Sequence, residues 1–218
     1  MSGAIFDPWP LVRLAGAVIA AGLAIKLMDD YLDREFDALV GRRTVAAWLG
    51  PGTVAYALAA LAVATLLEAQ AAGTLFLASY AVGMAHEPGR RLPTGLTAWQ
   101  ESLLAAVLGL VLGGFAAMCS ATAAMFFVQC ADDFRDAASD RMAGGQTLAS
   151  RLGRVETGML AVAALLVALA INPLLAIVVA AGAALVDALL RWAARRLPPM
   201  PGETAGEGEE SGCSSRWM

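Results

Sequence analysis

Aspartates that could bind a metal ion gather in two short segments of the chain. The segments are Asp29-Asp30-Tyr-Leu-Asp33-Arg-Glu-Phe-Asp37 and Asp132-Asp133-Phe-Arg-Asp136-Ala-Ala-Ser-Asp140. A spacing of four residues predicts that the carboxylates of each segment lie on one helix face, where like charges repel. A hard divalent cation relieves that repulsion, and proteins commonly share Mg²⁺ between carboxylates and the phosphates of a substrate. The two segments therefore predict a diphosphate held through Mg²⁺ between them.

The two acidic segments begin a longer internal repeat. They align without gaps when Asp29 is placed on Asp132, and the same alignment matches two glycines, a threonine, an alanine and a leucine further along: Gly41 with Gly144, Thr44 with Thr147, Ala46 with Ala149, Leu49 with Leu152 and Gly50 with Gly153. So long a period predicts two similar helical halves, about 9–97 and 98–197, rather than a solenoid of short repeats.

Composition identifies the medium in which these segments must fold. Hydrophobic residues make up 59% of the 218 residues, charged residues only 16%, and the mean hydropathy is +0.65. Soluble domains carry roughly 25% charged residues, so a soluble enzyme and a nucleic-acid-binding module are excluded. Three cysteines without a C-x-x-C pair indicate neither a disulfide framework nor a zinc site. The sequence predicts an all-α integral membrane protein whose partner is the lipid bilayer.

Seven apolar runs approach the roughly 20 residues that a bilayer-spanning helix needs. A turn at Gly113-Gly114 is required, because one helix over 98–131 would be far longer than the hydrocarbon core. The expected transmembrane domain is 1–197, and the polar residues 198–218 are predicted to be a disordered tail. The seven runs cover about 9–28, 53–68, 71–86, 98–113, 115–131, 155–171 and 173–192.

The distribution of arginine predicts how these spans are oriented. With seven spans and the N-terminus outside, the connections at 68–73, 113–114 and 172–173 contain no Lys or Arg, whereas the opposite connections are rich in arginine. Basic loops stay on the cytoplasmic side of a membrane. We therefore expect both acidic segments to face the cytoplasm.

Basic side chains beside the acidic segments are candidates for contacting a diphosphate, which needs charged hydrogen-bond donors as well as metal. The arginines could equally serve only to fix the loops in the cytoplasm. Lys26, one helical turn before Asp30 in an apolar run, is expected to pair with Asp30 or with phosphate. The candidates are Lys26, Arg42, Arg43, Arg90, Arg91, Arg135 and Arg141.

Together these residues resemble the UbiA superfamily of intramembrane prenyltransferases. The first segment is similar to the family motif N-D-x-x-D-x-x-x-D, with Asp29 where the family usually has Asn. The second, from Asp133 through Gly144, Thr147 and Gly153, is similar to D-x-x-D-x-x-x-D-x-x-x-G-x-x-T-L-A-x-x-L-G.

The resemblance implies Mg²⁺-dependent transfer of an isoprenyl group from a prenyl diphosphate to a hydrophobic acceptor. It implies that Asp33, Asp37, Asp136 and Asp140 are catalytic. The metal ligands, directly or through water, would be Asp29, Asp30, Asp33, Asp37, Asp133, Asp136 and Asp140. Two alternatives stay open: a terpene cyclase of the same superfamily, which the small number of spans favours, and a membrane scaffold that binds cations without catalysis.

Overall fold

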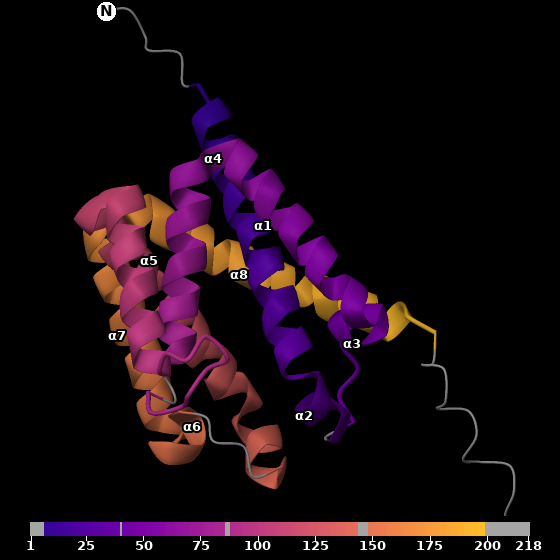
Figure 1. The fold of residues 1–218 in the computed structure, drawn as a ribbon. Helices are drawn as coiled ribbons and strands as arrows, with labels where there is room; N and C mark the ends of the chain where they lie inside the picture. Colours follow the sequence, from indigo (N-terminus) through magenta and orange to yellow (C-terminus); the bar gives the residue numbers. More distant parts are fainter. Residues whose placement is uncertain (1–6, 40, 86–87, 144–147, 199–218) are drawn as a thin grey trace, which may run out of the picture.

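The computed structural model describes residues 7–39, 41–85, 88–143 and 148–198, and gives the backbone alone for 138–143. The described part is a bundle of α-helices (Figure 1). The expected tail at 199–218 lies outside the described residues. The helices are α1 (Trp9–Leu32), α2 (Arg34–Leu39), α3 (Val45–Leu49), α4 (Thr53–Met84), α5 (Ala98–Ala143), α6 (Leu148–Arg151), α7 (Arg154–Ile171) and α8 (Pro173–Arg196), with a 3₁₀ turn, η1 (Gly50–Gly52), before α4.

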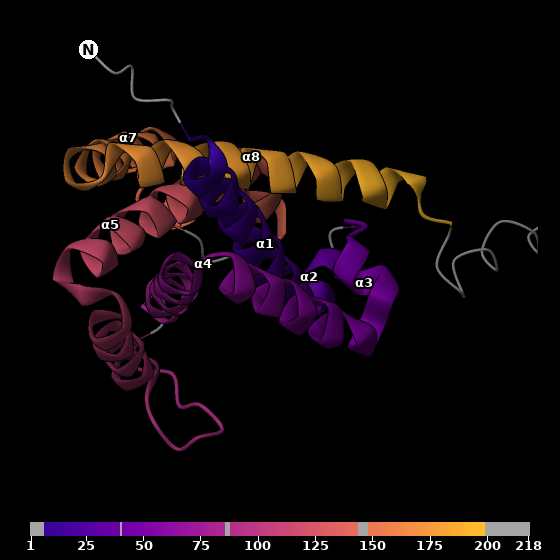
Figure 2. The same ribbon diagram turned by 90° about the horizontal axis from the view of Figure 1, so that it is seen from above.

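Five helical stretches of the described chain are long and apolar enough to cross a membrane: Trp9–Leu32, Val45–Met84, Ala98–Ala137, Arg154–Ile171 and Pro173–Arg196. The expectation of an all-α membrane bundle is therefore met. Figure 2 shows α8 lying across the bundle, with α7 beside its first turns and α1 crossing it.

The two longest helices, α4 and α5, are each interrupted near the middle. Glu68 leaves helical geometry in α4, with φ −155° and ψ 90°. Gly114 does so in α5, with φ 78° and ψ 171°, at the turn that the sequence predicts. Only glycine adopts that backbone region readily, since it has no Cβ. The sequence predicts a non-helical connection over residues 68–73. That prediction is wrong, because the helix resumes directly after Glu68.

Side chains satisfy the carbonyl groups that these interruptions expose. The Arg13 guanidinium donates two hydrogen bonds, of 3.0 and 2.8 Å, to the Leu67 carbonyl, and the Gln70 amide donates one of 2.9 Å to the Gly113 carbonyl. A backbone carbonyl without a partner is costly in an apolar medium, so these contacts make the interruptions tolerable. In Figure 1 the interruption in α4 lies near the start of α1, whereas α2 and α6 lie at the other end of the bundle.

Small residues form most of the buried core. The main cluster packs α1, α4, α5, α7 and α8 together and is rich in alanine, which lets helix backbones approach closely in a membrane. A Cβ at Gly113 would collide with the Thr74 Cγ2 atom, so the close approach of α4 and α5 depends on a glycine there. The cluster comprises Val18, Leu75, Ala78, Met118, Ala121, Ala124, Ala168, Leu175, Ala176 and Val179.

Candidate functional site

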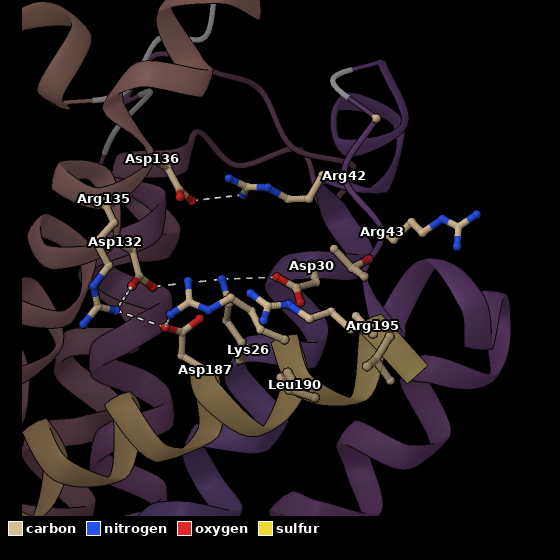
Figure 3. A pocket seen from close by; sticks show the side chains of 15 residues that line it. Lys26, Asp30, Arg42, Arg43, Asp132, Arg135, Asp136, Asp187, Leu190 and Arg195 are labelled. Atoms are coloured by element: carbon tan, nitrogen blue, oxygen red, sulfur yellow. Dashed lines mark hydrogen bonds and ion pairs between the residues drawn. The ribbon is translucent and has the colours of Figure 1, made fainter. Parts of the chain in front are cut away.

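A polar cavity of about 390 Å³ lies where the end of α1, the segment before α3, the second half of α5 and the end of α8 meet (Figure 3). It brings together residues far apart in the sequence, including members of both acidic segments. Its lining residues are Lys26, Asp30, Gly41, Arg42, Arg43, Thr44, Val45, Asp132, Arg135, Asp136, Asp187, Leu190, Arg191, Ala194 and Arg195.

A second cavity, of about 300 Å³, adjoins the first and is mostly apolar. Residues of α1, α4, α5 and α8 line it, among them Leu75, Phe76, Met125, Phe127 and Val179. Four charged residues line both cavities and so mark the boundary between them: Lys26, Asp132, Arg135 and Asp187. The protein thus has a charged cavity next to an apolar one, with four charged residues common to both.

Lys26 connects the two acidic segments. Its ammonium nitrogen lies 3.2 Å from an Asp30 oxygen, 3.9 Å from an Asp29 oxygen and 4.0 Å from an Asp132 oxygen. The predicted partnership with Asp30 is confirmed. A half-buried lysine needs such partners in an apolar bundle.

Arg42 makes a second connection between the acidic segments. Its Nη1 atom lies 3.0 Å from an oxygen of Asp136 and 3.8 Å from an oxygen of Asp37. The Asp37 side chain is only 6% exposed. Burial raises the pKa of Asp37 to about 6, although the neighbouring Arg42 opposes the shift.

The first acidic segment does not form one continuous helix face, which corrects the expectation from its spacing. Helix α1 ends at Leu32, and Asp33 follows as its C-cap with φ −88° and ψ 2°. Helix α2 then starts at Arg34. Of the four aspartates, Asp30 lines the polar cavity and Asp29 the apolar one, whereas Asp33 and Asp37 are not among the lining residues of either.

The second acidic segment stays within α5, and its adjacent aspartates have different environments. Asp132 lines both cavities. Asp133 is buried, and its Oδ2 atom accepts a 3.0 Å hydrogen bond from the Leu148 backbone N–H at the start of α6. Asp133 therefore ties the start of α6 to α5. Asp136 lines the polar cavity and meets Arg42.

The other predicted site residues separate into three groups. Arg135 lies at the boundary of the two cavities, and Arg43 is among the lining residues of the polar cavity although Figure 3 shows its side chain directed away. Arg90 and Arg91 belong to the connection between α4 and α5 and are not among the residues that line either cavity. The side chains of Asp140 and Arg141 lie outside the described residues.

The prediction missed Asp187, Arg191 and Arg195, all on α8. Asp187 meets Arg135 at 3.1 Å and also pairs with Arg191. A signal for Asp187 was present, because it is the only acidic residue of α8, and an isolated charge in an apolar span is functional by default. Its distance in sequence from both acidic segments concealed the connection.

The donors at the polar cavity suit a Mg²⁺ ion that is shared with a substrate. Asp30, Asp132 and Asp136 supply carboxylate oxygens to one cavity. Within the described ranges no three His, Cys, Asp or Glu side chains converge closely enough to hold an ion by themselves. Mg²⁺ typically takes one or two carboxylates and completes its shell with water and phosphate, so these three carboxylates are ligands of the type that such an ion takes.

In comparisons with known proteins, no family model, no curated protein and no solved structure matches this chain.

Proposed function

We propose that this protein is a Mg²⁺-dependent intramembrane prenyltransferase that moves an isoprenyl group from a prenyl diphosphate to a hydrophobic acceptor. One observation carries the proposal. A charged cavity and an apolar cavity lie side by side and share the lining residues Lys26, Asp132, Arg135 and Asp187. A prenyl diphosphate has the matching build, with a highly charged head joined directly to a hydrocarbon chain.

The charge of the polar cavity favours an anionic head group. Six basic and four acidic residues line it, although the side chain of one of the basic residues, Arg43, is directed away. Guanidinium and ammonium groups bind phosphate oxygens through strong charge-assisted hydrogen bonds. Arginines from α5, α8 and the segment before α3 surround this compartment, so the diphosphate would be contacted from several sides.

Asp30, Asp132 and Asp136 are the residues that would hold Mg²⁺ together with the diphosphate. When bound, the ion would neutralise the negative charge that grows on the departing diphosphate. Lys26 and Arg42 already connect the acidic segments, and they keep the carboxylates of α1 and α5 at the same cavity. The motif resemblance to the UbiA superfamily also implies metal roles for Asp30 and Asp136.

In the proposed reaction the prenyl diphosphate is cleaved at the boundary of the two cavities. The bond between the first prenyl carbon and the oxygen that joins it to the diphosphate breaks, and both electrons stay with that oxygen. The allylic cation is held among apolar side chains, which exclude water. The acceptor forms the new bond to this carbon and passes its proton to the released diphosphate. Basic side chains at the polar cavity stabilise the charge that the diphosphate gains.

The membrane arrangement belongs to the same proposal. The interruptions at Glu68 and Gly114 divide α4 and α5 into halves short enough to cross separately, which would give seven crossings in two related halves. The polar cavity would then face the cytoplasm, where arginine-rich loops remain.

The direct test is release of diphosphate by the purified protein in lipid nanodiscs, with Mg²⁺ and prenyl diphosphates of increasing length, with and without aromatic acceptors. We expect release that requires Mg²⁺ and accelerates with an acceptor, because the cation is productive only beside a nucleophile. Cyclic hydrocarbon or alcohol that forms equally without any acceptor would replace transfer by terpene cyclisation. Absence of release under all conditions, with Mg²⁺ still bound, would favour the cation-binding scaffold.

A further inference from the structure

Asp187 is the carboxylate that α8 contributes to the site. It is the only acidic residue among the 24 residues of α8. Its side chain is 13% exposed, and it belongs to neither acidic segment. A charge in such a helix costs several kcal/mol unless partners compensate it, so its partners indicate what it does.

Two arginines compensate Asp187. The Oδ2 atom lies 3.1 Å from Nη1 of Arg135, which comes from α5, and it also pairs with Arg191 one turn later on α8. The same Nη1 atom of Arg135 lies 3.4 Å from Asp132. The Arg135 guanidinium is therefore fixed between a carboxylate of its own helix and one of α8, as the dashed lines in Figure 3 show.

The orientation of Arg135 matters for the proposed reaction because of where Arg135 and Asp187 lie. Arg135 and Asp187 both line the polar and the apolar cavity. If the diphosphate occupies the first and the hydrocarbon chain the second, the carbon–oxygen bond that breaks lies at their boundary. Of the arginines that line the polar cavity, Arg135 is the one that also lines the apolar cavity, so it would lie beside the oxygen on which charge develops.

We infer that Asp187 is a positioning residue that fixes Arg135 at the boundary of the two cavities, so that the guanidinium donates to the departing diphosphate. The inference rests on the proposed function.

Charge repulsion between Asp187 and a bound diphosphate predicts that removing the Asp187 charge strengthens binding. A negative charge near an anion site weakens binding, so Asp187→Asn would tighten the binding of diphosphate if charge were all that mattered. If Asp187 orients Arg135, the same substitution weakens binding, because the guanidinium loses its fixed direction. The sign of the effect therefore separates the two roles.

The test is a double-mutant cycle with D187N and R135Q, read by calorimetric titration of the full chain in nanodiscs with inorganic diphosphate and Mg²⁺. We expect D187N to weaken binding about tenfold when Arg135 is present, and to leave it unchanged or tighter in R135Q. D187E should restore part of the affinity. R196Q serves as control, because Arg196 stacks on Trp192 and is not among the residues that line either cavity, and it should bind like the unmodified chain.

A second measurement follows the reaction. D187N should lower kcat at least about tenfold with KM within about threefold, since the orientation matters most when the bond breaks. Tighter binding by D187N with Arg135 present, or equal losses in both backgrounds, would overturn the inference while leaving the proposed function intact. An unmodified chain that binds no diphosphate would remove the proposed function and the inference together.

Discussion

The two acidic segments have nearly the same aspartate pattern, yet they contribute to the site in different ways. Lys26 and Gln129 occupy equivalent positions and contact the equivalent aspartate one turn later, Lys26 at 3.2 Å from Asp30 and Gln129 at 3.4 Å from Asp133. Asp30 faces the polar cavity, whereas Asp133 is buried against the start of α6. The second segment places Asp132 at the cavity instead.

This difference shows that matched sequence does not imply matched function. A two-fold arrangement of identical ligands would place Asp30 opposite Asp133. The described side chains place Asp30 opposite Asp132 and set Lys26 between them. An ammonium in the first segment and an amide in the second make the two segments electrostatically unequal.

The largest expected effect distinguishes neighbours within the second segment. We expect Asp132→Asn to lower the rate of diphosphate release at least about a hundredfold, because it removes a carboxylate at the boundary of both cavities. The melting temperature in detergent should change little, since the side chain is partly exposed. The control is Glu35→Gln, whose side chain is 89% exposed and should keep full activity. Full activity of Asp132→Asn would contradict the assignment.

The next substitution tests the structural role of the neighbouring aspartate. Asp133→Ala leaves the part-buried Leu148 N–H without its acceptor, which should lower stability by about 1–3 kcal/mol. The measurement is thermal unfolding of the detergent-solubilised protein, compared with Asp132→Asn. Unchanged melting together with lost activity would make Asp133 a metal ligand, as the resemblance implies, and would restore the symmetry between the segments.

The third prediction exchanges the residues that make the segments unequal. Lys26→Gln gives the first segment the amide of the second, and we expect about tenfold weaker binding of inorganic diphosphate in a calorimetric titration. Gln129→Lys should not restore binding in this variant, because Gln129 contacts Asp133 rather than the carboxylates of the polar cavity. Restored affinity in the double variant would show that the two positions are interchangeable.

The smallest effect concerns a part of the repeat that the two halves share. Gly50 and Gly153 are equivalent, and both have positive φ, 55° and 112°. Replacing either by Ala should cost about 1–2 kcal/mol of stability, because an L residue is strained there. Chemical or thermal unfolding measures the loss, and the folded fraction should keep its activity per molecule. A selective loss of activity in one variant would show that this glycine contributes to the site and not only to stability.

Residue types and spacing predicted much of this protein correctly. High hydropathy predicted an all-helical membrane bundle, the glycine pair predicted the interruption of α5, and the apolar surroundings of Lys26 predicted its partnership with Asp30. These properties follow from composition and local geometry. A long apolar run must form helices in a bilayer, and a buried ammonium must find a carboxylate.

Other features depend on contacts between distant elements, which spacing does not contain. The four-residue spacing predicts that Asp29, Asp33 and Asp37 share one helix face, but α1 ends before Asp33. Asp132 and Asp133 are indistinguishable in the sequence, and only the position of α6 assigns Asp133 to a backbone N–H. Asp187 joins the site because α8 crosses the bundle and brings its carboxylate to Arg135. Sequence determined the charges available in the membrane, and the packing of the helices decided which of them meet, because side-chain partners in an apolar bundle are set by the crossing of helices.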